Sequence, residues 1–172
     1  MISLNIDRKI LAELIVFVAL ASVLYLIKPF SLPQGGAITA GSMIPILLFS
    51  IRRGCKYGLL SGIIFGLIVF VQEPFFFHPV QWLLDYPIAF GLLGLAGITR
   101  KYYVLGIGLA MFGRLISHFL SGIIFFASYT PEGMSPIIYS IIYNGSYLSI
   151  EFVISAVILY ALFKRKIFKI YQ

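Results

Sequence analysis

The chain has 172 residues, of which 60% are hydrophobic and only 11% are charged. Soluble domains are about 45–50% apolar and about 25% charged, so this composition excludes a soluble globular protein and indicates an integral membrane protein. The net charge of +7 is compatible with a nucleic-acid partner, but the basic residues are confined largely to alternate loops, which argues against one. Cys55 is the only cysteine, which excludes an internal disulfide and a multi-cysteine metal site.

Six apolar segments approach the length of a membrane span, which is about 20 residues with about 17–25 tolerated. We therefore predict an all-α integral membrane protein with six transmembrane helices in one domain, residues 1–172. The second segment is short, and we expect it to be tilted or partly shielded. The first lacks a small-x-small cleavage site, so we expect no cleavable signal peptide. In chain order the segments are Ile10–Ile27, Ala37–Ile51, Tyr57–Val71, Val80–Ile98, Tyr102–Ser128 and Ile137–Phe163.

The basic residues predict which side of the membrane each loop faces. Six spans place both termini on one side, and 11 of the 13 basic residues lie at the termini or in the two loops that share their side. Cytoplasmic loops are enriched in lysine and arginine, so both termini are predicted to be cytoplasmic, in a cell membrane. The 11 residues are Arg8, Lys9, Arg52, Arg53, Lys56, Arg100, Lys101, Lys164, Arg165, Lys166 and Lys169.

Four polar side chains from the last three segments are predicted to lie at similar depth in the outer half of the membrane. Asp85, for example, lies about five residues inside the fourth segment, roughly 8 Å at about 1.5 Å per residue. A carboxylate near the bilayer centre costs about 2.5–3.5 kcal/mol, so one inside a span usually faces a cavity or a partner. The shared depth suggests one wet pocket that opens outward. The four residues are Asp85, His118, Tyr139 and Asn144.

Gly122 lies four residues after His118, so both are expected on one face of the fifth segment. Its missing side chain lets either a ligand ring or a neighbouring helix approach, and both interpretations stay open at this point. Phe125 and Phe126 follow about one turn later, where they can form an aromatic wall.

Two further charges, Arg114 and Glu151, are predicted to form a structural ion pair. Each lies about 14 residues from the outer end of its segment, on successive antiparallel helices. Two buried charges at the same depth can neutralise each other.

Several catalytic motifs are absent from the sequence. There is no P-loop, so the chain cannot hydrolyse ATP by that route. There is no HExxH motif and no pair of intramembrane aspartates, which argues against a membrane metalloprotease or aspartyl protease. The chain has two histidines and one of them, His78, lies in a connector, so we assemble no metal site. We expect no catalytic residue, no metal and no cofactor.

A series of short motifs occurs in order along nearly the whole chain, and their spacing is more specific than any one of them. They are Leu32-Pro33-Gln34-Gly35-Gly36, Met43-Ile44-Pro45-Ile46, Arg52-Arg53-Gly54, His78-Pro79-Val80-Gln81 through Leu84-Asp85-Tyr86, Arg114 with His118-x-x-Ser121-Gly122-x-x-Phe125-Phe126, and Tyr139-Ser140-x-x-Tyr143-Asn144-x-x-Tyr147. The set resembles the thiamine-specific substrate-binding (S) component of energy-coupling factor (ECF) vitamin transporters, the ThiT family.

The resemblance implies a non-enzymatic six-helix S-component that captures thiamine from outside the cell. Such a subunit docks on a transmembrane coupling protein and two cytoplasmic ATPases, which fits the absent P-loop. Thiamine joins a cationic thiazolium to a neutral aminopyrimidine, so a carboxylate and aromatic faces complement it. The residues that the resemblance assigns to the thiamine site are Asp85, Tyr86, His118, Gly122, Phe126, Tyr139 and Asn144.

The sequence departs from the family pattern in three places. Asp85 stands where some members have glutamate, so its reach is one methylene shorter. Phe126 stands where some members have a stacking tryptophan. The small-xxx-small pattern on the first helix, which implies a docking face, reads Ile15-x-x-x-Ala19. The loop Pro33–Gly36 is expected to be either a lid or a plain connector.

Three alternatives stay open from the sequence. The chain could be an S-component for another vitamin. It could be a small membrane enzyme that uses Asp85 and His118 as acid and base. It could also be a scaffold without a ligand, in which the same polar groups serve only packing.

Overall fold

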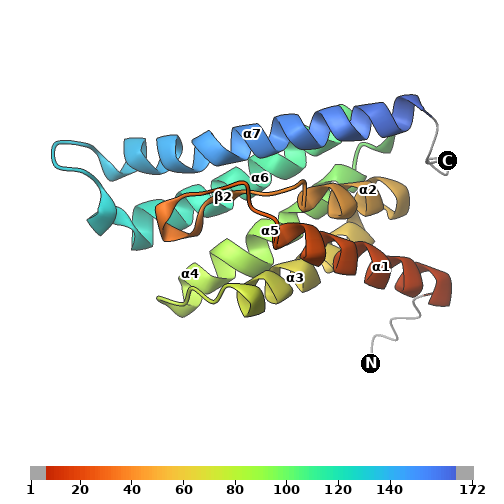
Figure 1. Cartoon of the computed structure of the whole chain (residues 1–172), viewed down its shortest axis with the longest axis horizontal. Helices are drawn as coiled ribbons and strands as arrows, with labels where there is room; N and C mark the ends of the chain where they lie inside the picture. The colour runs from red at the N-terminus through yellow and green to blue at the C-terminus, as the bar shows by residue number, and fades with distance from the viewer. Residues whose placement is uncertain (1–6, 166–172) are drawn as a thin grey trace.

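The computed structural model describes residues 7–165, which form an elongated bundle of helices. The first helix, α1 (Arg8–Tyr25), begins at the end of the bundle where the last helix, α7 (Pro136–Lys164), ends (Figure 1). This is the arrangement expected for an even number of crossings. The side of the membrane on which this end lies stays a prediction.

Between α1 and α7 lie three continuous helices, one segmented helix and a short hairpin. The continuous helices are α2 (Met43–Arg53), α3 (Cys55–Gln72) and α6 (Tyr103–Phe125). The segmented helix consists of α4 (Pro79–Leu83), η2 (Leu84–Ile88), α5 (Ala89–Gly91) and η3 (Leu92–Gly97). The hairpin pairs β1 (Phe30–Ser31) with β2 (Ala37–Ile38) around η1 (Pro33–Gly35). Single 3-10 turns, η4 (Arg100–Tyr102) and η5 (Ala127–Tyr129), flank α6.

Among residues 7–165, four helical segments are long and apolar enough to cross a membrane. They are Cys55–Gln72, Pro79–Gly97, Arg100–Phe125 and Pro136–Lys164. The other two predicted spans are helical but do not meet this standard. α1 is 18 residues long and includes Arg8, Lys9 and Glu13, and α2 has only 11 residues.

The prediction of a helix over Ala37–Ile51 is wrong at its start. Ala37 and Ile38 belong to the hairpin, and α2 begins only at Met43, after Gly41 turns the chain with a φ of +84°. This backbone conformation is one that glycine adopts readily and that L side chains disfavour. The expectation that the second segment is shielded is confirmed, because eight of the 11 residues of α2 are buried.

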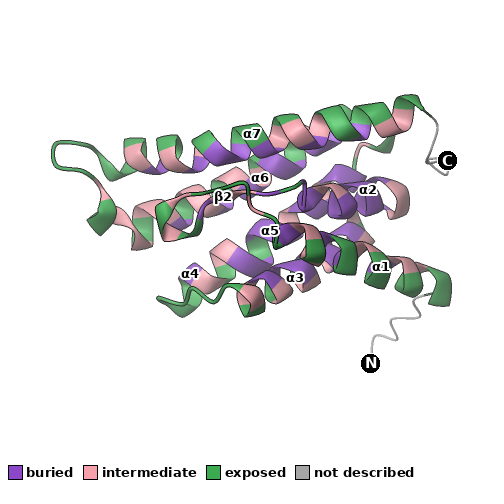
Figure 2. Ribbon diagram, viewed as in Figure 1, coloured by how far each residue is buried: buried purple, intermediate pink, exposed green. Residues whose placement is uncertain are grey.

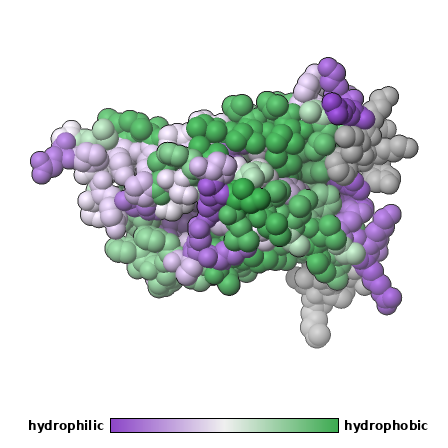
Figure 3. All heavy atoms as spheres, in the orientation of Figure 1, coloured by the Kyte–Doolittle hydropathy of each residue, from purple (hydrophilic) through white to green (hydrophobic). Residues whose placement is uncertain are grey.

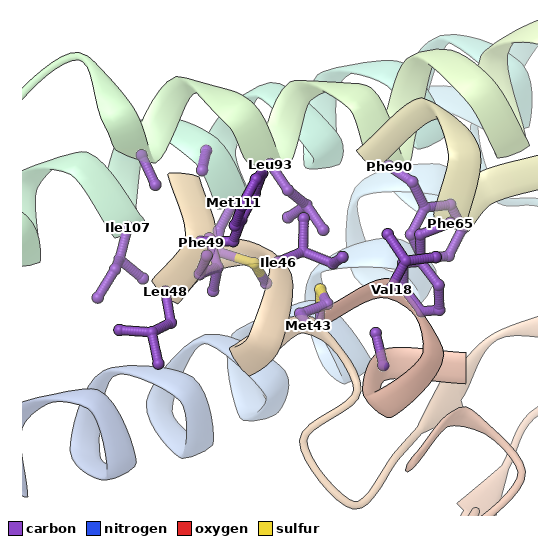
Figure 4. Packing of buried hydrophobic residues seen from close by; sticks show 14 of the residues in the cluster. Val18, Met43, Ile46, Leu48, Phe49, Phe65, Phe90, Leu93, Ile107 and Met111 are labelled. Atoms are coloured by element: carbon purple, nitrogen blue, oxygen red, sulfur yellow. The ribbon is translucent and has the colours of Figure 1, made fainter. Parts of the chain in front are cut away.

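The hydrophobic core surrounds α2. Phe49, Ile46 and Met43 of α2 are almost completely buried, and Figure 4 shows them among side chains from α1, α3, the segmented helix and α6. Buried residues face the middle of the bundle, whereas α1 and the outer side of α7 carry many exposed residues (Figure 2). Many of these exposed residues are apolar, and Figure 3 shows a broad hydrophobic surface on this face of the molecule. A surface of this kind suits contact with lipid chains.

Glycines let the segmented helix approach α3 at backbone distance. Gly58, Gly62 and Gly66 are spaced four residues apart and therefore lie on one face of α3. A Cβ atom at Gly62 would collide with the backbone carbonyl of Phe90, and one at Gly66 with that of Tyr86. Small residues at helix contacts are the usual device for close packing inside membranes. This contact positions the part of the chain that contains Asp85.

We expect Gly62→Ala to destabilise the protein by about 1–3 kcal/mol, because the added methyl group must push the segmented helix away from α3. The midpoint of thermal unfolding of the purified protein should fall. The matched control is Gly108→Ala on α6, where an added Cβ meets nothing within 4 Å. If both variants unfold at the same temperature, close packing at Gly62 does not matter for stability.

Candidate ligand-binding site

A cavity of about 330 Å³ lies between the hairpin, the end of α3, the segmented helix, α6 and α7. Pockets that take small organic molecules usually measure about 300–1,000 Å³. The structure brings together at this cavity all seven residues assigned to the thiamine site, and their role in binding stays a prediction. They are Asp85, Tyr86, His118, Gly122, Phe126, Tyr139 and Asn144.

Asp85 lies in a π-helical turn, η2, that interrupts the segmented helix. Pro87 lies within this turn and has no backbone N–H to donate, so a regular α-helical ladder cannot continue through it. The carbonyl of Leu84 instead accepts from the backbone N–H of Ala89 and from Ser117 Oγ, which is 2.6 Å away on α6. Turns of this type occur frequently at functional sites.

The Asp85 carboxylate has three polar partners from two helical segments. Its Oδ2 accepts from Gln81 Nε2 at 2.7 Å and from Ser121 Oγ at 2.9 Å, and its Oδ1 lies 3.1 Å from His118 Nδ1. Hydrogen bonds to an ionised group are stronger than neutral ones. Three such contacts fix the orientation of the carboxylate and offset part of its burial.

His118 links Asp85 to Arg114. Arg114 Nε donates to His118 Nε2 at 3.2 Å, so Nε2 must be the acceptor and the ring proton must lie on Nδ1, where it is donated to Asp85. This arrangement requires a neutral imidazole. Arg114 also lies 4.0 Å from the ring centre of Phe90 and 2.7 Å from Met43 Sδ, and it lines the cavity. The histidine therefore lies between the Asp85 carboxylate and a cation that itself lines the cavity.

The predicted direct ion pair between Arg114 and Glu151 is not among the contacts of residues 7–165. Arg114 turns toward His118 and Phe90, whereas Glu151 accepts from both the backbone N–H and the Oγ1 of Thr39. Glu151 is 1% exposed and does not line the cavity. The reason is geometric: equal depth along two helices does not determine the direction in which each side chain points around its helix.

The structure confirms that Gly122 permits close helix packing, and the approach of a ligand ring stays a prediction. An added Cβ atom would collide with the Ser140 side chain and come within 3.4 Å of Asn144 Nδ2, so the glycine permits α6 and α7 to approach closely. It also lines the cavity. Asn144 donates to the Ser140 carbonyl at 3.0 Å and accepts from Tyr147 at 3.2 Å, so its amide is held in one orientation.

Aromatic side chains form much of the cavity wall. Tyr139, Tyr143 and Tyr147 are spaced four residues apart on α7, with ring centres 5.9 Å and 6.0 Å apart in succession. Two phenylalanines also line the cavity. Phe126 stacks on Phe75, with ring centres 5.7 Å apart and ring planes at 24°. Such faces attract organic cations.

Several residues that line the cavity were not predicted from the sequence as site residues. The spacing of Tyr143 and Tyr147 from Tyr139 was a usable signal, as was the position of Gln81 one helical turn before Asp85. No local pattern marked the contributions of Tyr25, Glu73 and Phe75, which come from other parts of the chain.

The hairpin loop forms part of the cavity wall. Gln34, Gly35 and Gly36 line the cavity, and Gln34 has a φ of +62°. The Tyr143 hydroxyl donates to the Pro33 carbonyl and accepts from the Gly36 N–H at 3.1 Å. The loop is thus attached to α7 over the site. Its movement as a lid stays a prediction.

We expect Tyr143→Phe to loosen this loop, because both hydrogen bonds are lost while the ring remains. Amide hydrogen exchange at residues 34–36 should become faster, by roughly 5- to 10-fold for a loss of about 1 kcal/mol. Tyr160→Phe, on an exposed part of α7, is the control and should leave exchange unchanged. Equal exchange in the wild type and Tyr143→Phe would show that the hydroxyl does not restrain the loop.

Comparison with known proteins identifies the family. Residues 11–170 match the family model described as "Thiamine transporter protein" (Thia_YuaJ). The chain belongs to this family. The thiamine transporter ThiT of Bacillus subtilis (strain 168) is 36% identical over 172 aligned positions, which cover 89% of each chain. The thiamine transporter ThiT of Lacticaseibacillus paracasei (strain ATCC 334) is 30% identical over 123 positions, which cover 60% of this chain and 61% of that one.

A solved structure of ThiT from Listeria monocytogenes has the same fold, with a TM-score of 0.84 over 92% of this chain and 94% of that one, at 24% identity. Together with the four apolar segments described above, these relatives identify the chain as a multi-pass bacterial membrane protein. Members of the family are named as transporters, so the alternative of a membrane enzyme using Asp85 and His118 is not supported.

Proposed function

We propose that this protein captures thiamine from outside the cell as the substrate-binding subunit of an ECF-type transporter. The observation that carries the proposal is the Asp85 carboxylate, oriented by three polar partners in an aromatic cavity, in a chain of the thiamine transporter family. Relatives named thiamine transporters support the choice of ligand.

The chemistry of thiamine matches the charges and faces of the cavity. The thiazolium ring carries a permanent positive charge, which Asp85 complements. Flat aromatic faces at Phe126 and Tyr139 attract the same charge and can stack on either ring. The aminopyrimidine has donors and acceptors on its edge, and the Asn144 amide presents both kinds of group.

The other proposed site residues provide space for the ligand or hold neighbouring groups in position. Gly122 leaves room for a ring beside α6. His118 orients Asp85 and offers an imidazole face. The Tyr86 hydroxyl donates to the Glu73 carbonyl at 3.1 Å and accepts from the Phe75 N–H at 3.1 Å, so it positions the connector that brings Phe75 to the cavity.

Under the predicted topology the cavity lies toward the outside, and energy must come from other subunits. The sequence has no P-loop, so ATP hydrolysis is assigned to two separate ATPases that a transmembrane coupling protein connects to this chain. The exposed side of α1 includes Ile15 and Ala19, which are available for that docking.

We expect Asp85→Asn to weaken thiamine binding by about 1–3 kcal/mol, because a charge-assisted contact with the cation is lost. Isothermal titration of the purified protein measures this change. Glu132→Gln is the matched control, since Glu132 is an exposed acid in the loop before α7. Unchanged thiamine affinity in Asp85→Asn would contradict the assignment of the site.

The same titration distinguishes thiamine from other vitamins. We expect tight binding of thiamine and none of riboflavin or biotin, because these two lack a fixed positive charge. Tight binding of either would favour the alternative of an S-component for another vitamin, and no binding of any vitamin would favour a scaffold.

We also expect the purified protein alone to bind thiamine without accumulating it. In vesicles, uptake against a gradient should require ATP and the coupling module, since this chain has no ATP site of the P-loop type. Accumulation by the chain alone would overturn the assignment as a subunit of a larger transporter.

A further inference from the structure

A second carboxylate lines the cavity besides Asp85. Glu73 follows the end of α3, and its side chain is 54% exposed. Its Oε2 forms an ion pair with Lys28 Nζ and lies 3.4 Å from the Tyr25 hydroxyl, which donates to it. Among residues 7–165 the other oxygen, Oε1, accepts no hydrogen bond. A negative group thus borders the space that a ligand would occupy.

Lys28 lies behind this wall rather than in solvent. Its side chain is only 11% exposed, and Nζ lies 4.0 Å from the ring centre of Tyr25. Tyr25 lines the cavity, whereas Lys28 is not among the described lining residues. A lysine near a helix end usually extends its ammonium group into water. Here the ammonium group is kept inside, against the carboxylate and the tyrosine ring that face the cavity.

We propose that Lys28 and Glu73 are a specificity-determining pair that sets the electrostatic potential of the cavity toward organic cations. Lys28 offsets the charge of Glu73, so that Asp85, whose link to Arg114 runs through a neutral histidine, provides most of the attraction for a cation. This inference rests on the proposed capture of a singly charged aromatic cation. It adds two residues that select the ligand by its charge, whereas the aromatic wall selects it by contact with its rings.

Neutralising the two members of the pair should change the affinity for a cation in opposite directions. Removing the charge of Lys28 leaves Glu73 unopposed, so cation affinity rises. Removing the charge of Glu73 leaves the Lys28 ammonium group without its carboxylate partner near the cavity, so cation affinity falls. A pair with only a structural role would behave differently. Loss of either partner would remove the same ion pair between the segments that follow α1 and α3, so both variants would change affinity in the same direction.

The test compares Lys28→Gln, Glu73→Gln and the double variant in the purified full chain. Each is titrated with thiamine and with an uncharged analogue in which a neutral aromatic ring replaces the thiazolium. Two control variants accompany them. Lys28→Arg keeps the charge, and Lys101→Gln removes an equivalent charge near η4, outside the residues that line the cavity. Thermal unfolding is measured for every variant.

We expect thiamine affinity to rise roughly 3- to 10-fold in Lys28→Gln and to fall by a similar factor in Glu73→Gln, as for unit charges several ångströms away in a partly wet site. The double variant should return close to the wild type, because the net charge is restored. Affinity for the uncharged analogue should stay constant throughout, and both controls should match the wild type.

Loss of affinity in both single variants, for both ligands, would overturn the inference and identify the pair as a structural fastening. Should Glu73→Gln fail to fold, Lys28→Gln decides alone, because the inference requires its preference for the cation over the uncharged analogue to increase. A wild-type protein that binds neither ligand would overturn the proposed function itself. If the wild type binds thiamine but both single variants change thiamine affinity in the same direction, only the proposed role of the pair is overturned.

Discussion

The arrangement of the site depends on the Asp85 carboxylate, whose side chain is only 16% exposed and needs hydrogen-bond donors. Asp85 projects from a π-helical turn, and its partners come from one turn earlier in the same segment and from α6. A charge in this environment is costly unless donors surround it, so α6 has to lie close to the segmented helix. That proximity in turn relies on α3, where glycines at the contact let the segmented helix lie backbone to backbone. Packing deep in the bundle thus determines where the charge of the site is found.

Each of the two carboxylates at the cavity lies close to a cation. Asp85 is connected to Arg114 through a neutral histidine, and Glu73 is paired directly with Lys28. Both cations also lie over aromatic rings, those of Phe90 and Tyr25. Arg114 itself lines the cavity, whereas Lys28 is not among the described lining residues. A nearby cation reduces the cost of holding each negative group within a membrane protein.

Membership of the thiamine transporter family and the chemistry of the cavity both favour an organic cation as the ligand. The family identifies a transporter, and the cavity combines a fixed carboxylate, an oriented amide and several aromatic faces, which together suit a flat organic cation. Because the sequence contains no P-loop, the proposed function assigns ATP hydrolysis to other subunits. The hairpin loop attached to Tyr143 forms part of the cavity wall.

The membrane class, the approximate limits of the helices, the family resemblance and seven residues that meet at one cavity could all be predicted from the linear chain. Hydrophobic length and the order of motifs are properties of the linear chain, so they can be read without a structure. Three features were decided only by tertiary structure: the late start of α2 at Met43, the separate partners of Arg114 and Glu151, and the pairing of Lys28 with Glu73. Spacing along a helix sets the height of a side chain, whereas its direction and its partners depend on how neighbouring helices rotate and pack against one another.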